Sequence, residues 1–455
     1  MALSVVILAA GQGTRMRSAL PKVLHELAAK PLVEHVINTA QKLGAHDIHV
    51  VYGHGGDVVP TALSHCPVEW VKQDQQLGTG HAVAQAMPHI PTEHQVLVLY
   101  GDVPLTSIDT LTTLIQMAQQ SGFGLLTIGL ADATGYGRIV RDETGKVIRI
   151  VEHKDATESE RLINEVNTGI LATSRAHLAK WLEQLDNNNS QGEYYLTDII
   201  AMAVNDGIDI STTSPADEHE VLGINNKRQL AELERAYQLQ QANMLMDAGV
   251  TLRDPARFDL RGSVSCGKDV VIDTNVILQG ENEIGNEVEI GPNCLIIDSK
   301  IDDGVTVLAN SVIENAVVGK NSKVGPFARL RPEAQLGEDA HIGNFVEVKK
   351  AQIGKGSKVN HLSYVGDSIV GNNVNVGAGT ITCNYDGANK HLTEIGDNVF
   401  VGSDTQLIAP VKIGEGATIA AGSTITKEVE AGALALSRVK QVSKSGWKRP
   451  QKKKC

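Results

Sequence analysis

An aliphatic residue followed by glycine returns every six positions through much of the second half of the chain. The pattern starts at Ile284, and the five hexads between Val318 and Glu347 follow one another without a gap. A period of six fits neither an α-helix, which repeats every 3.6 residues, nor an amphipathic strand, which repeats every two. The hexads include IGNEVE, IGPNCL, VGKNSK, VGPFAR, LRPEAQ, LGEDAH, IGNFVE, IGKGSK, VNHLSY, VGNNVN, VGAGTI, IGDNVF, VGSDTQ, LIAPVK, IGEGAT and IAAGST.

Each hexad predicts one short strand and one corner of a three-sided prism, so three hexads make a coil of roughly 18 residues. The aliphatic first position should stack inside the prism, and small residues recur at the fifth position, where bulk would not fit. Such a core needs few aromatic side chains, which agrees with an aromatic content of only 4%. The repeats therefore predict a left-handed parallel β-helix.

Length and charge limit what else the chain can be. A chain of 455 residues is expected to hold two or three domains. Its formal net charge of −12 argues against a general nucleic-acid binder. No apolar run approaches a membrane span, and the opening residues lack a basic leader, so we expect a cytoplasmic protein. The five cysteines form no CxxC pair, which argues against a structural zinc site or a disulfide framework.

The first half alternates short apolar runs with helical stretches, which predicts an α/β domain with a Rossmann-like sheet and ligands at the carboxyl ends of its strands. The expected domains are residues 1–225, a linker helix at 226–248, a β-helix at 249–437 and a basic tail at 438–455 without fixed structure. The expected strands are Val5–Ala10, Ile48–Tyr52, Val96–Tyr100 and Gly124–Leu130, and the expected helices are Pro31–Leu43, Ile108–Gln120 and Asn226–Asp247.

A phosphate-binding segment follows the first predicted strand, in LAAGQGTRMRSALPKVL. Gly11 and Gly13 let the backbone turn and aim N–H groups at a phosphate, and Arg15 and Lys22 add positive charge. Neither a GxxxxGK[ST] P-loop nor a complete GxGxxG motif is present, and an ordinary βα turn is the plain alternative. A second strand ends in Asp102, where its carboxylate can enter the same cleft; a turn aspartate before Val-Pro is the alternative there.

The segment Leu8–Lys22 resembles the LxxGxGTRxxxxxxxxPK signature of sugar-1-phosphate nucleotidyltransferases. Joined to a hexapeptide β-helix, it is similar to the bacterial family of bifunctional uridylyltransferase–acetyltransferases that make UDP-N-acetylglucosamine. The resemblance covers nearly the whole chain. It implies a mixed sheet, acetyl-CoA and UTP as co-substrates, Mg²⁺, a homotrimer, and a role in supplying peptidoglycan and lipopolysaccharide precursors. Further matching motifs are QLGTGHA, YGDVP, GYGRI, VEHKDA, NTGI and TCNYDGANK.

The resemblance also implies the parts of a uridylyl site. Asp102 and Asn225 would hold the metal, although Asn225 could instead cap the following helix. Arg15 and Lys22 would stabilise the transition state. Glu152 would bind the sugar, with an ion pair to Lys154 as its alternative. The full substrate-binding set is Leu8, Ala9, Ala10, Gly11, Lys22, Gln73, Gly78, Thr79, Tyr100, Gly101, Asp102, Gly137, Glu152, Asn167 and Asn225.

Polar residues at hexad positions where small or aliphatic residues are usual predict a second site. Arg331 and Lys349 stand where glycine is usual, and His361 is the candidate general base for acetyl transfer to an amine. A histidine on the coil surface is its plain alternative. The repeat is interrupted by the polar loop Thr382–Glu394. The substrate set from the residues themselves is Arg331, Lys349, Tyr364, Asn375 and Lys390. The resemblance implies that Asn384 and Tyr385 also line this site and that Ala378, Ser403, Ala421 and Arg438 contact acetyl-coenzyme A.

Three other readings compete with a bifunctional enzyme. The β-helix could be a spacer on a simple uridylyltransferase, or the whole chain a non-catalytic scaffold that binds nucleotide sugars. A carbonic anhydrase of the γ type would need three zinc-binding histidines. The only histidines of the repeat region, His341, His361 and His391, lack a suitable spacing.

Overall fold

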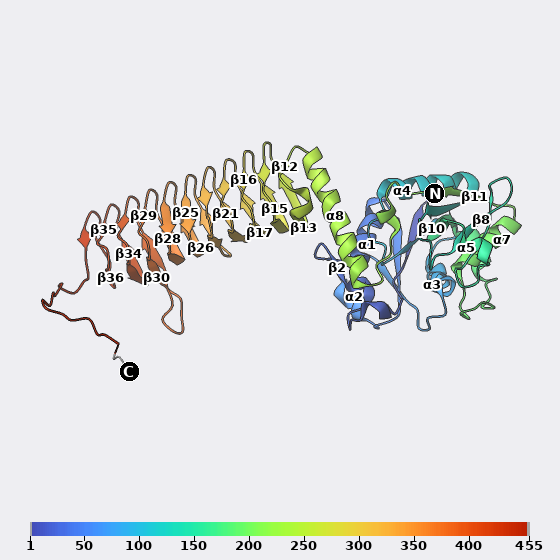
Figure 1. Cartoon of the computed structure of the whole chain (residues 1–455), viewed down its shortest axis with the longest axis horizontal. Coiled ribbons are helices and arrows are strands. Elements are labelled where there is room, and N and C mark those ends of the chain that lie inside the picture. Colours follow the sequence, from blue (N-terminus) through green and yellow to red (C-terminus); the bar gives the residue numbers. More distant parts are fainter. Residues whose placement is uncertain (1, 453–455) are drawn as a thin grey trace. The chain divides into compact units, whose positions relative to one another are not determined.

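The structure, a computed structural model, describes residues 2–452 and divides into two compact units (Figure 1). The division falls between Tyr237 and Gln238, inside helix α8 (Lys227–Asp247). Helix α8 thus belongs to unit 1 in its first half and to unit 2 in its second. On the unit 2 side, the Gln238 side chain pairs with both backbone groups of Leu260, accepting from its N–H at 2.7 Å and donating to its carbonyl at 3.0 Å.

Unit 1 is built on a nine-stranded mixed sheet in the order β11-β7-β10-β6-β1-β4-β5, with β8 and β9 attached beside β10. Strand β1 runs parallel to both β4 and β6, whereas β10 is antiparallel to β6 and β7. The expected mixed α/β sheet is therefore confirmed. The strands of this sheet are β1 (Leu3–Leu8), β4 (Asp47–Tyr52), β5 (Glu69–Lys72), β6 (Gln95–Tyr100), β7 (Gly122–Gly129), β8 (Arg138–Arg141), β9 (Val147–Val151), β10 (Glu165–Ser174) and β11 (Asp209–Thr213), and β2 (Glu26–Leu27) and β3 (Lys30–Pro31) form a separate antiparallel pair.

Helices cover both faces of this sheet, which is why its strands read as continuous apolar runs. Side chains of β1 alternate between two cores: Ile7 packs with α1 and α4, whereas Val6 packs with α3, α6 and α7. Helix α4 starts at its cap Ser107, whose hydroxyl accepts from Thr110 N–H, and ends at Gly122 with a φ of 94°. The helices are α1 (Leu32–Lys42), α2 (Val58–Ala62), α3 (Thr79–Ala86), α4 (Ile108–Ser121), α5 (Glu158–Arg161), α6 (Arg175–Leu182) and α7 (Ile199–Asn205), with short 3₁₀ turns η1 (Thr14–Met16), η2 (Lys22–Leu24), η3 (Met87–His89), η4 (Leu196–Asp198) and η5 (Glu218–Val221).

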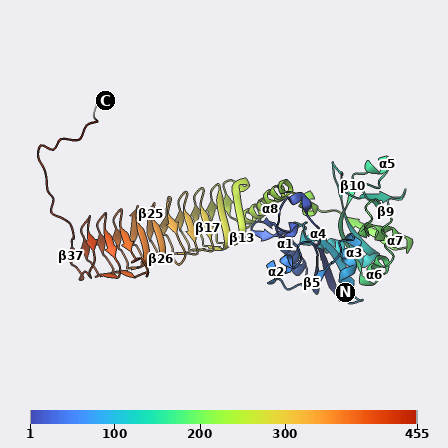
Figure 2. The ribbon, with the colours of Figure 1, turned by 90° about the horizontal axis from the view of Figure 1, so that it is seen from below.

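Unit 2 is a stack of parallel coils, seen edge-on in Figures 1 and 2. Successive coils are offset by 17 or 18 residues, as in the pairs Val271 with Glu289 and Glu289 with Thr306. The coils begin with β12, earlier than the first hexad recognised in the sequence, because Arg253, Asp273 and Gln279 follow the buried Leu252, Ile272 and Leu278, where many later hexads have glycine. The elements are β12 (Thr251–Leu252), η6 (Pro255–Arg257), β13 (Phe258–Cys266), β14 (Val271–Ile272), β15 (Val276–Ile284), β16 (Glu289–Ile290), β17 (Leu295–Ile297), β18 (Lys300–Ile301), β19 (Thr306–Val307), β20 (Val312–Glu314), β21 (Val317–Val318), β22 (Lys323–Val324), β23 (Arg329–Leu330), β24 (Gln335–Leu336), β25 (His341–Asn344), β26 (Glu347–Ile353), β27 (Lys358–His361), β28 (Tyr364–Val370), β29 (Asn375–Val376), β30 (Ile381–Cys383), β31 (Thr393–Ile395), β32 (Phe400–Val401), β33 (Gln406–Ile408), β34 (Val411–Ile413), β35 (Thr418–Ile419), β36 (Thr424–Ile425) and β37 (Leu434–Ala435).

The hexad positions behave as their spacing predicts. The aliphatic first residues stack in register, for example Ile284 on Ile301 and Val318 on Leu336, and all four are buried. The fifth residues are also buried; among the gap-free hexads they are Ser322, Ala328, Ala334, Ala340 and Val346. The parallel β-helix is therefore confirmed.

One coil is longer than the others. Asn375 pairs with Phe400, an offset of 25 residues, because a loop between β30 and β31 leaves the stack and returns to it. Figure 1 shows this loop protruding from the coils. An isolated bridge between Tyr385 and Lys390 closes the loop on itself.

Residues 438–452 contain no helix or strand, and residues 453–455 of the predicted tail lie outside the described residues. Among residues 2–452, no helix combines the length and the apolar character that a membrane span requires. The four cysteines in this range, Cys66, Cys266, Cys294 and Cys383, are free thiols.

Candidate functional sites

A cavity of about 510 Å³ opens at the carboxyl ends of β1 and β6 in unit 1, a size within the usual range for ligand pockets. Ten residues predicted from the sequence line it. Five lining residues were not predicted: Gln12, Val23, Gln76, Ala82 and Glu193. The predicted lining residues are Leu8, Ala9, Ala10, Gly11, Lys22, Gln73, Gly78, Thr79, Tyr100 and Asp102.

Glycine is required at Gly13 because the side chain of Lys22 crosses directly over it. Gly13 has a φ of 61°, and a Cβ there would lie 2.6 Å from the Cβ of Lys22. At Gly11, by contrast, a Cβ would meet nothing within 4 Å. The tight turn predicted for this loop is therefore centred on Gly13, which lets Lys22 reach the cavity from η2.

Lys22 makes hydrogen bonds to both predicted metal ligands, Asp102 and Asn225. Its Nζ donates to Asp102 Oδ2 at 2.5 Å and to Asn225 Oδ1 at 3.2 Å, and Arg15 Nη2 also donates to Asn225 Oδ1, at 2.8 Å. Four residues from three distant segments thus meet at one point. The cap alternative for Asn225 is wrong, because the neighbouring Asn226 caps α8 by accepting from two backbone N–H groups at 2.9 and 3.0 Å.

The loop that contains Gln73, Gly78 and Thr79 is held in shape by contacts that no sequence motif predicts. Gln73 Nε2 lies 2.9 Å from His81 Nδ1, and Thr79 Oγ1 accepts from the N–H of Leu196 at 3.2 Å. The backbone of Tyr194 bonds to this loop on both sides, which carries Glu193 to the cavity. No motif in the sequence connects residues 193–196 with residues 73–79, which is why Glu193 was missed.

Gly137, Glu152 and Asn167 form a group of their own beside Tyr100. Asn167 N–H donates to the carbonyl of Gly137 at 2.8 Å, and a Cβ on Gly137 would lie 3.4 Å from Glu152 Oε1. These three do not line the 510 Å³ cavity. Tyr100 connects the two groups, because it lines both that cavity and a small neighbouring one that Asn167 lines.

Two side chains of this region have shifted pKa values. Burial, together with the charges of Asp198 and Asp155, raises the pKa of Glu152, and the hydrogen bond from the Thr197 hydroxyl offsets part of that rise. Thr197 donates to Glu152 at 3.1 Å, and Lys154 donates to Gln191 instead, so the ion-pair alternative for Glu152 is wrong. Burial and the charge of Asp102 raise the pKa of Tyr100, which keeps its phenol protonated at neutral pH.

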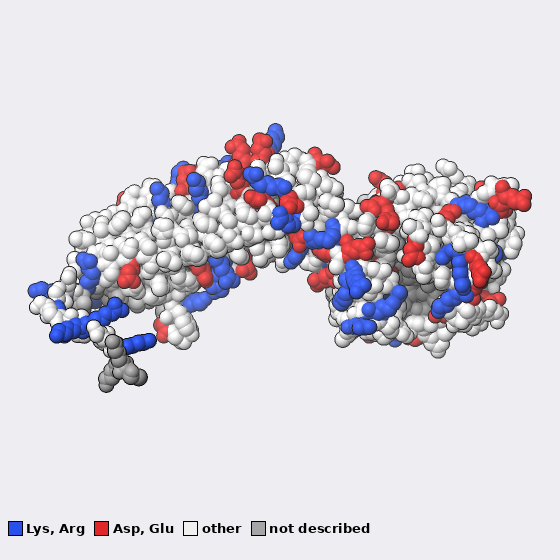
Figure 3. Space-filling view, viewed as in Figure 1, with Lys and Arg blue, Asp and Glu red and all other residues white. Residues whose placement is uncertain are grey.

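In unit 2 the first group of predicted residues is cationic. Arg331, Lys349 and Lys390 lie close enough that Lys390, followed by Arg331, lowers the pKa of Lys349. Arg331 is held by an ion pair to Glu347 at 2.7 Å. Figure 3 shows Lys and Arg side chains gathered beside the protruding loop. Glu347 offsets one of the three positive charges, and the positive charge that remains suits an anionic group such as a phosphate.

Tyr364 and Asn384 complete this group. Asn384 Nδ2 donates to the hydroxyl of Tyr364 at 3.4 Å and to Asp367 Oδ2 at 2.5 Å, which fixes the base of the protruding loop. Tyr385, from the same loop, is 61% exposed, and its hydroxyl donates to the carbonyl of Gly387 at 2.6 Å.

His361 lies at the end of β27, one corner away from Tyr364 in β28. Its Nδ1 is 2.8 Å from Asn344 Oδ1, a residue that stands directly beside it in the preceding coil. Because an amide oxygen only accepts, Nδ1 carries the proton and Nε2 keeps a free lone pair. Asn344 was not predicted, although an inspection of positions 17 residues before His361 would have found it.

The predicted coenzyme residues form one column with His361. Continuing the pairs Val359 with Val376, Val376 with Val401 and Val401 with Ile419, the column runs through Ala378 and Ser403 to Ala421. Arg438 lies beside Gly422, where an added Cβ would be 3.6 Å from its Cδ. Asn375 is not in this column, because it pairs with Lys358.

Comparisons with known proteins were made for the whole chain. The family model described as a MobA-like NTP transferase domain matches residues 5–251, a GMPPB C-terminal domain matches residues 260–342, and bacterial transferase hexapeptide repeats match residues 392–427. The chain is 58% identical to the "Bifunctional protein GlmU" of Marinobacter nauticus, over 99% of both chains. It is 59% identical to the protein of that name from Methylococcus capsulatus, over 99% of this chain and 98% of that one. A solved UDP-glucose pyrophosphorylase complexed with UDP-glucose covers 52% of this chain and 98% of its own, at 17% identity and a TM-score of 0.43.

Proposed function

The chain belongs to the bifunctional GlmU family, whose two activities are acetyl transfer and uridylyl transfer in UDP-N-acetylglucosamine synthesis, and from that premise we propose how its two units divide the work. Unit 2 acetylates glucosamine-1-phosphate with acetyl-CoA. Unit 1 then couples the N-acetylglucosamine-1-phosphate with UTP and releases pyrophosphate. The observation that supports this division is that Arg331, Lys349 and Lys390 lie close together within unit 2, whereas residues predicted for uridylyl transfer line a cavity within unit 1.

Asp102 and Asn225 are the proposed holders of Mg²⁺. One carboxylate and one amide oxygen fit this ion, which prefers oxygen ligands and usually takes only one or two from protein. Both oxygens already converge on a single cation of the chain, the ammonium of Lys22. When bound there, Mg²⁺ would offset negative charge on the phosphates of UTP.

The remaining residues of unit 1 bind and orient the two substrates. The backbone from Leu8 to Gly11 and the charges of Arg15 and Lys22 hold the triphosphate, and Gln73 with Gly78 and Thr79 hold the uracil. The sugar phosphate attacks the α-phosphorus in line, and pyrophosphate leaves. In the free protein Asn225 and Asp102 already hold Arg15 and Lys22 at the site, so these charges lie close to where the phosphates would bind.

Glu152, Gly137 and Asn167 are proposed to bind the N-acetylglucosamine. The absence of a side chain at Gly137 leaves room beside the Glu152 carboxylate, and Glu152 is mostly buried. A desolvated carboxylate is a strong acceptor for sugar hydroxyls.

For acetyl transfer, His361 is the proposed general base. Its Nε2 accepts the proton that the sugar amine loses as the amine attacks the thioester carbonyl, and coenzyme A leaves as the thiol. Asn344 is a positioning residue that keeps the proton on Nδ1. Arg331, Lys349 and Lys390 bind the sugar phosphate, and the small residues Ala378, Ser403 and Ala421 leave space for the coenzyme along the axis of the coils.

We also propose that the β-helix trimerises. Phe327 and Phe345 are 50% and 55% exposed and stack at 5.3 Å along one corner, and Leu362, 62% exposed, follows in the next coil. An apolar ridge of this kind marks an interface. Because Leu362 directly follows His361, a neighbouring subunit on the ridge would reach the acetyl site. The cytoplasm is the proposed location, since UTP and acetyl-CoA are its metabolites.

The decisive experiment supplies glucosamine-1-phosphate and acetyl-CoA without UTP or Mg²⁺ and follows release of the coenzyme A thiol. Thiol release matched by acetylated sugar phosphate is expected. If no thiol appears while uridylyl transfer from N-acetylglucosamine-1-phosphate proceeds, unit 2 is a structural element and the proposal for it is wrong.

A further inference from the structure

A second cluster of chemically active side chains lies in unit 1, at the amino-terminal ends of its central strands. His46 precedes β4, Asp47 is the first residue of β4, and His94 precedes β6. Strand β1 lies between β4 and β6, with Ser4 opposite Asp47. The cavity of about 510 Å³ described above opens at the carboxyl ends of the same strands, about 20 Å away for strands of this length.

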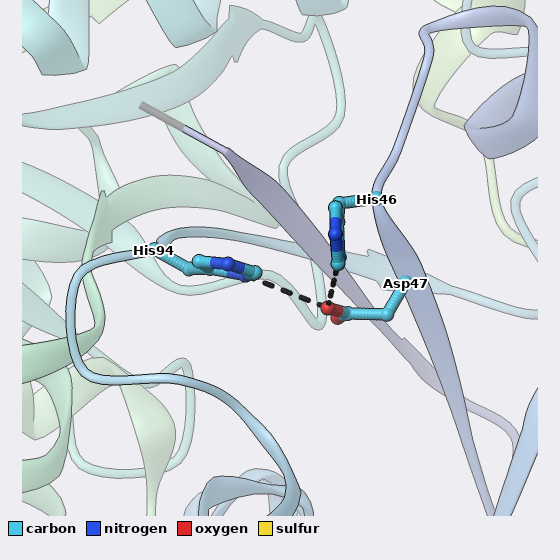
Figure 4. Close-up of side chains that lie close together, drawn as sticks. All are labelled: His46, Asp47 and His94. Carbon is cyan, nitrogen blue, oxygen red and sulfur yellow. Dashed lines mark hydrogen bonds and ion pairs between the residues drawn. The ribbon is translucent and has the colours of Figure 1, made fainter.

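The three side chains face one another, as Figure 4 shows. His46 Nδ1 lies 3.1 Å and His94 Nδ1 lies 3.4 Å from Asp47 Oδ2. All three ligand atoms lie within 4.8 Å of one another. In a tetrahedral site with bonds of 2.0–2.1 Å, the distance between ligand atoms is about 3.3 Å, so two edges of such a site are already at their proper length.

The backbone fixes two of the three groups. The N–H of His46 donates to the carbonyl of Leu3 at 2.7 Å, and the N–H of His94 donates to the carbonyl of Pro91 at 3.1 Å, while His94 Nδ1 lies 2.8 Å from Ser4 Oγ. The ring of His94 is 6% exposed, whereas the ring of His46 is 67% exposed. Because the His46 ring is exposed, a small rotation of it can shorten the distance between the ligand atoms of His46 and His94. The exposure also gives an ion a path from solvent.

The two oxygens of Asp47 have separate partners. Oδ2 faces His46 and His94, while Oδ1 lies 2.9 Å from Nε2 of His49, whose ring is 1% exposed. A buried partner that holds the second oxygen of a carboxylate ligand is a typical outer shell of a metal site. Further out, Glu69 contacts both His49 and His89.

The types of donor atom in the cluster also indicate which ion it suits. The set of two imidazoles and a carboxylate, with a water in the fourth position, is one that zinc and similar ions bind, whereas Mg²⁺ prefers oxygen alone.

We propose that His46, Asp47 and His94 bind a divalent transition-metal ion of the zinc type, at a site separate from the uridylyl and acetyl sites. The proposal does not depend on the roles assigned to those sites. The ion would join the loops that precede β4 and β6 and so stabilise unit 1.

The test uses the full-length metal-free protein without a histidine tag and titrates Zn²⁺ against a chromophoric chelator, with excess Mg²⁺ present. We expect one Zn²⁺ per chain that His46→Ala loses or binds at least 10–100-fold more weakly, the loss that even outer-shell changes cause. His46 is exposed, so this variant should fold. The matched control is His65→Ala, because His65 is similarly exposed and faces a single carboxylate, Glu34, at 3.6 Å.

Two further readouts separate a metal site from a hydrogen-bonded network. Zn²⁺ should raise the unfolding temperature of the natural protein and of His65→Ala, but not of His46→Ala. Co²⁺ should give the visible absorption of a low-coordinate site in the natural protein, and Asp47→Asn should remove it. Uridylyl transfer should be unchanged in His46→Ala. Equal Zn²⁺ affinity in the natural protein and His46→Ala would overturn the proposal and leave the cluster as a network of hydrogen bonds.

Discussion

The ammonium of Lys22 lies 2.5 Å from the carboxylate of Asp102, and the same nitrogen lies 3.2 Å from the side-chain oxygen of Asn225. Lys22 comes from the glycine-rich segment, Asp102 from the end of β6 and Asn225 from the residues before α8. One cation therefore holds together the ends of three segments at the mouth of the cavity. Substitution at any of the three should change the position of the other two.

Replacing Asp102 with asparagine should separate the two reactions. The Asp102→Asn variant should lose uridylyl transfer by roughly 100-fold or more, the usual loss when one electrostatic group is removed from a site. Its acetyl transfer should stay within twofold of the natural rate. Pyrophosphate release and coenzyme A thiol release measure the two reactions on one preparation, and Asp109→Asn on the exposed start of α4 is the control. A variant that lost both activities while folded would contradict the two-site arrangement.

The contact between Asn344 and His361 should set the pH dependence of acetyl transfer. Asn344→Asp places a carboxylate against Nδ1, which favours the imidazolium and raises the pKa of His361. Because the base must be neutral to accept a proton, the acidic limb of the rate profile should move to higher pH. Asn344→Ala should lower kcat without that displacement, and His361→Ala should abolish the reaction. If the pH–rate profile of acetyl transfer were the same for Asn344→Asp as for the natural protein, His361 would be excluded as the base.

The buried carboxylate of Glu152 should lower the free energy of unfolding at neutral pH. Its pKa is raised mainly by burial, so the folded state binds a proton more tightly than the unfolded chain. The resulting stability is present below the unfolded pKa and is lost as pH rises through the folded pKa. At neutral pH, Glu152→Gln should therefore unfold at a higher denaturant concentration, since the amide oxygen can still accept from Thr197. The same variant should lose about tenfold in uridylyl kcat/KM, because it replaces a charged acceptor for the sugar by a neutral one. Lower stability with full activity would contradict the proposed role.

The repeat pattern of the sequence was sufficient to predict unit 2, because the hexad period determines both which residues are inside and where each corner lies. Gly13 and Lys22 could also be predicted, because both belong to the complete nucleotidyltransferase signature at residues 8–22. Glu193 and Asn344 belong to no such signature. Each reaches its site through contacts between segments, Glu193 through backbone bonds to residues 77–80 and Asn344 through the offset of adjacent coils, and neither relation is visible in a local motif.

The exposed ridge should determine the oligomeric state. Phe345→Ser removes the central ring of the ridge, whose side chain is 55% exposed and so contributes little to the folding of one chain. We expect trimers in the natural protein, smaller species in the variant, and acetyl transfer lost together with the trimer while uridylyl transfer persists. Sedimentation equilibrium measures the mass, and Leu162→Ser, at an 81% exposed position of unit 1, is the control. A Phe345→Ser protein of unchanged mass and acetyl activity would show that the ridge is not the interface.

The loop between β30 and β31 adds several residues to one coil, yet Val376 still pairs with Val401 and the stacking resumes unchanged. Each coil touches only the one before and the one after it, so an insertion at a corner has no distant register to disturb. The same architecture can therefore change its substrate by lengthening or replacing a single corner, without rebuilding the core. In a fold of this kind, new specificities can arise by local insertion while the free energy of folding is left almost unaltered.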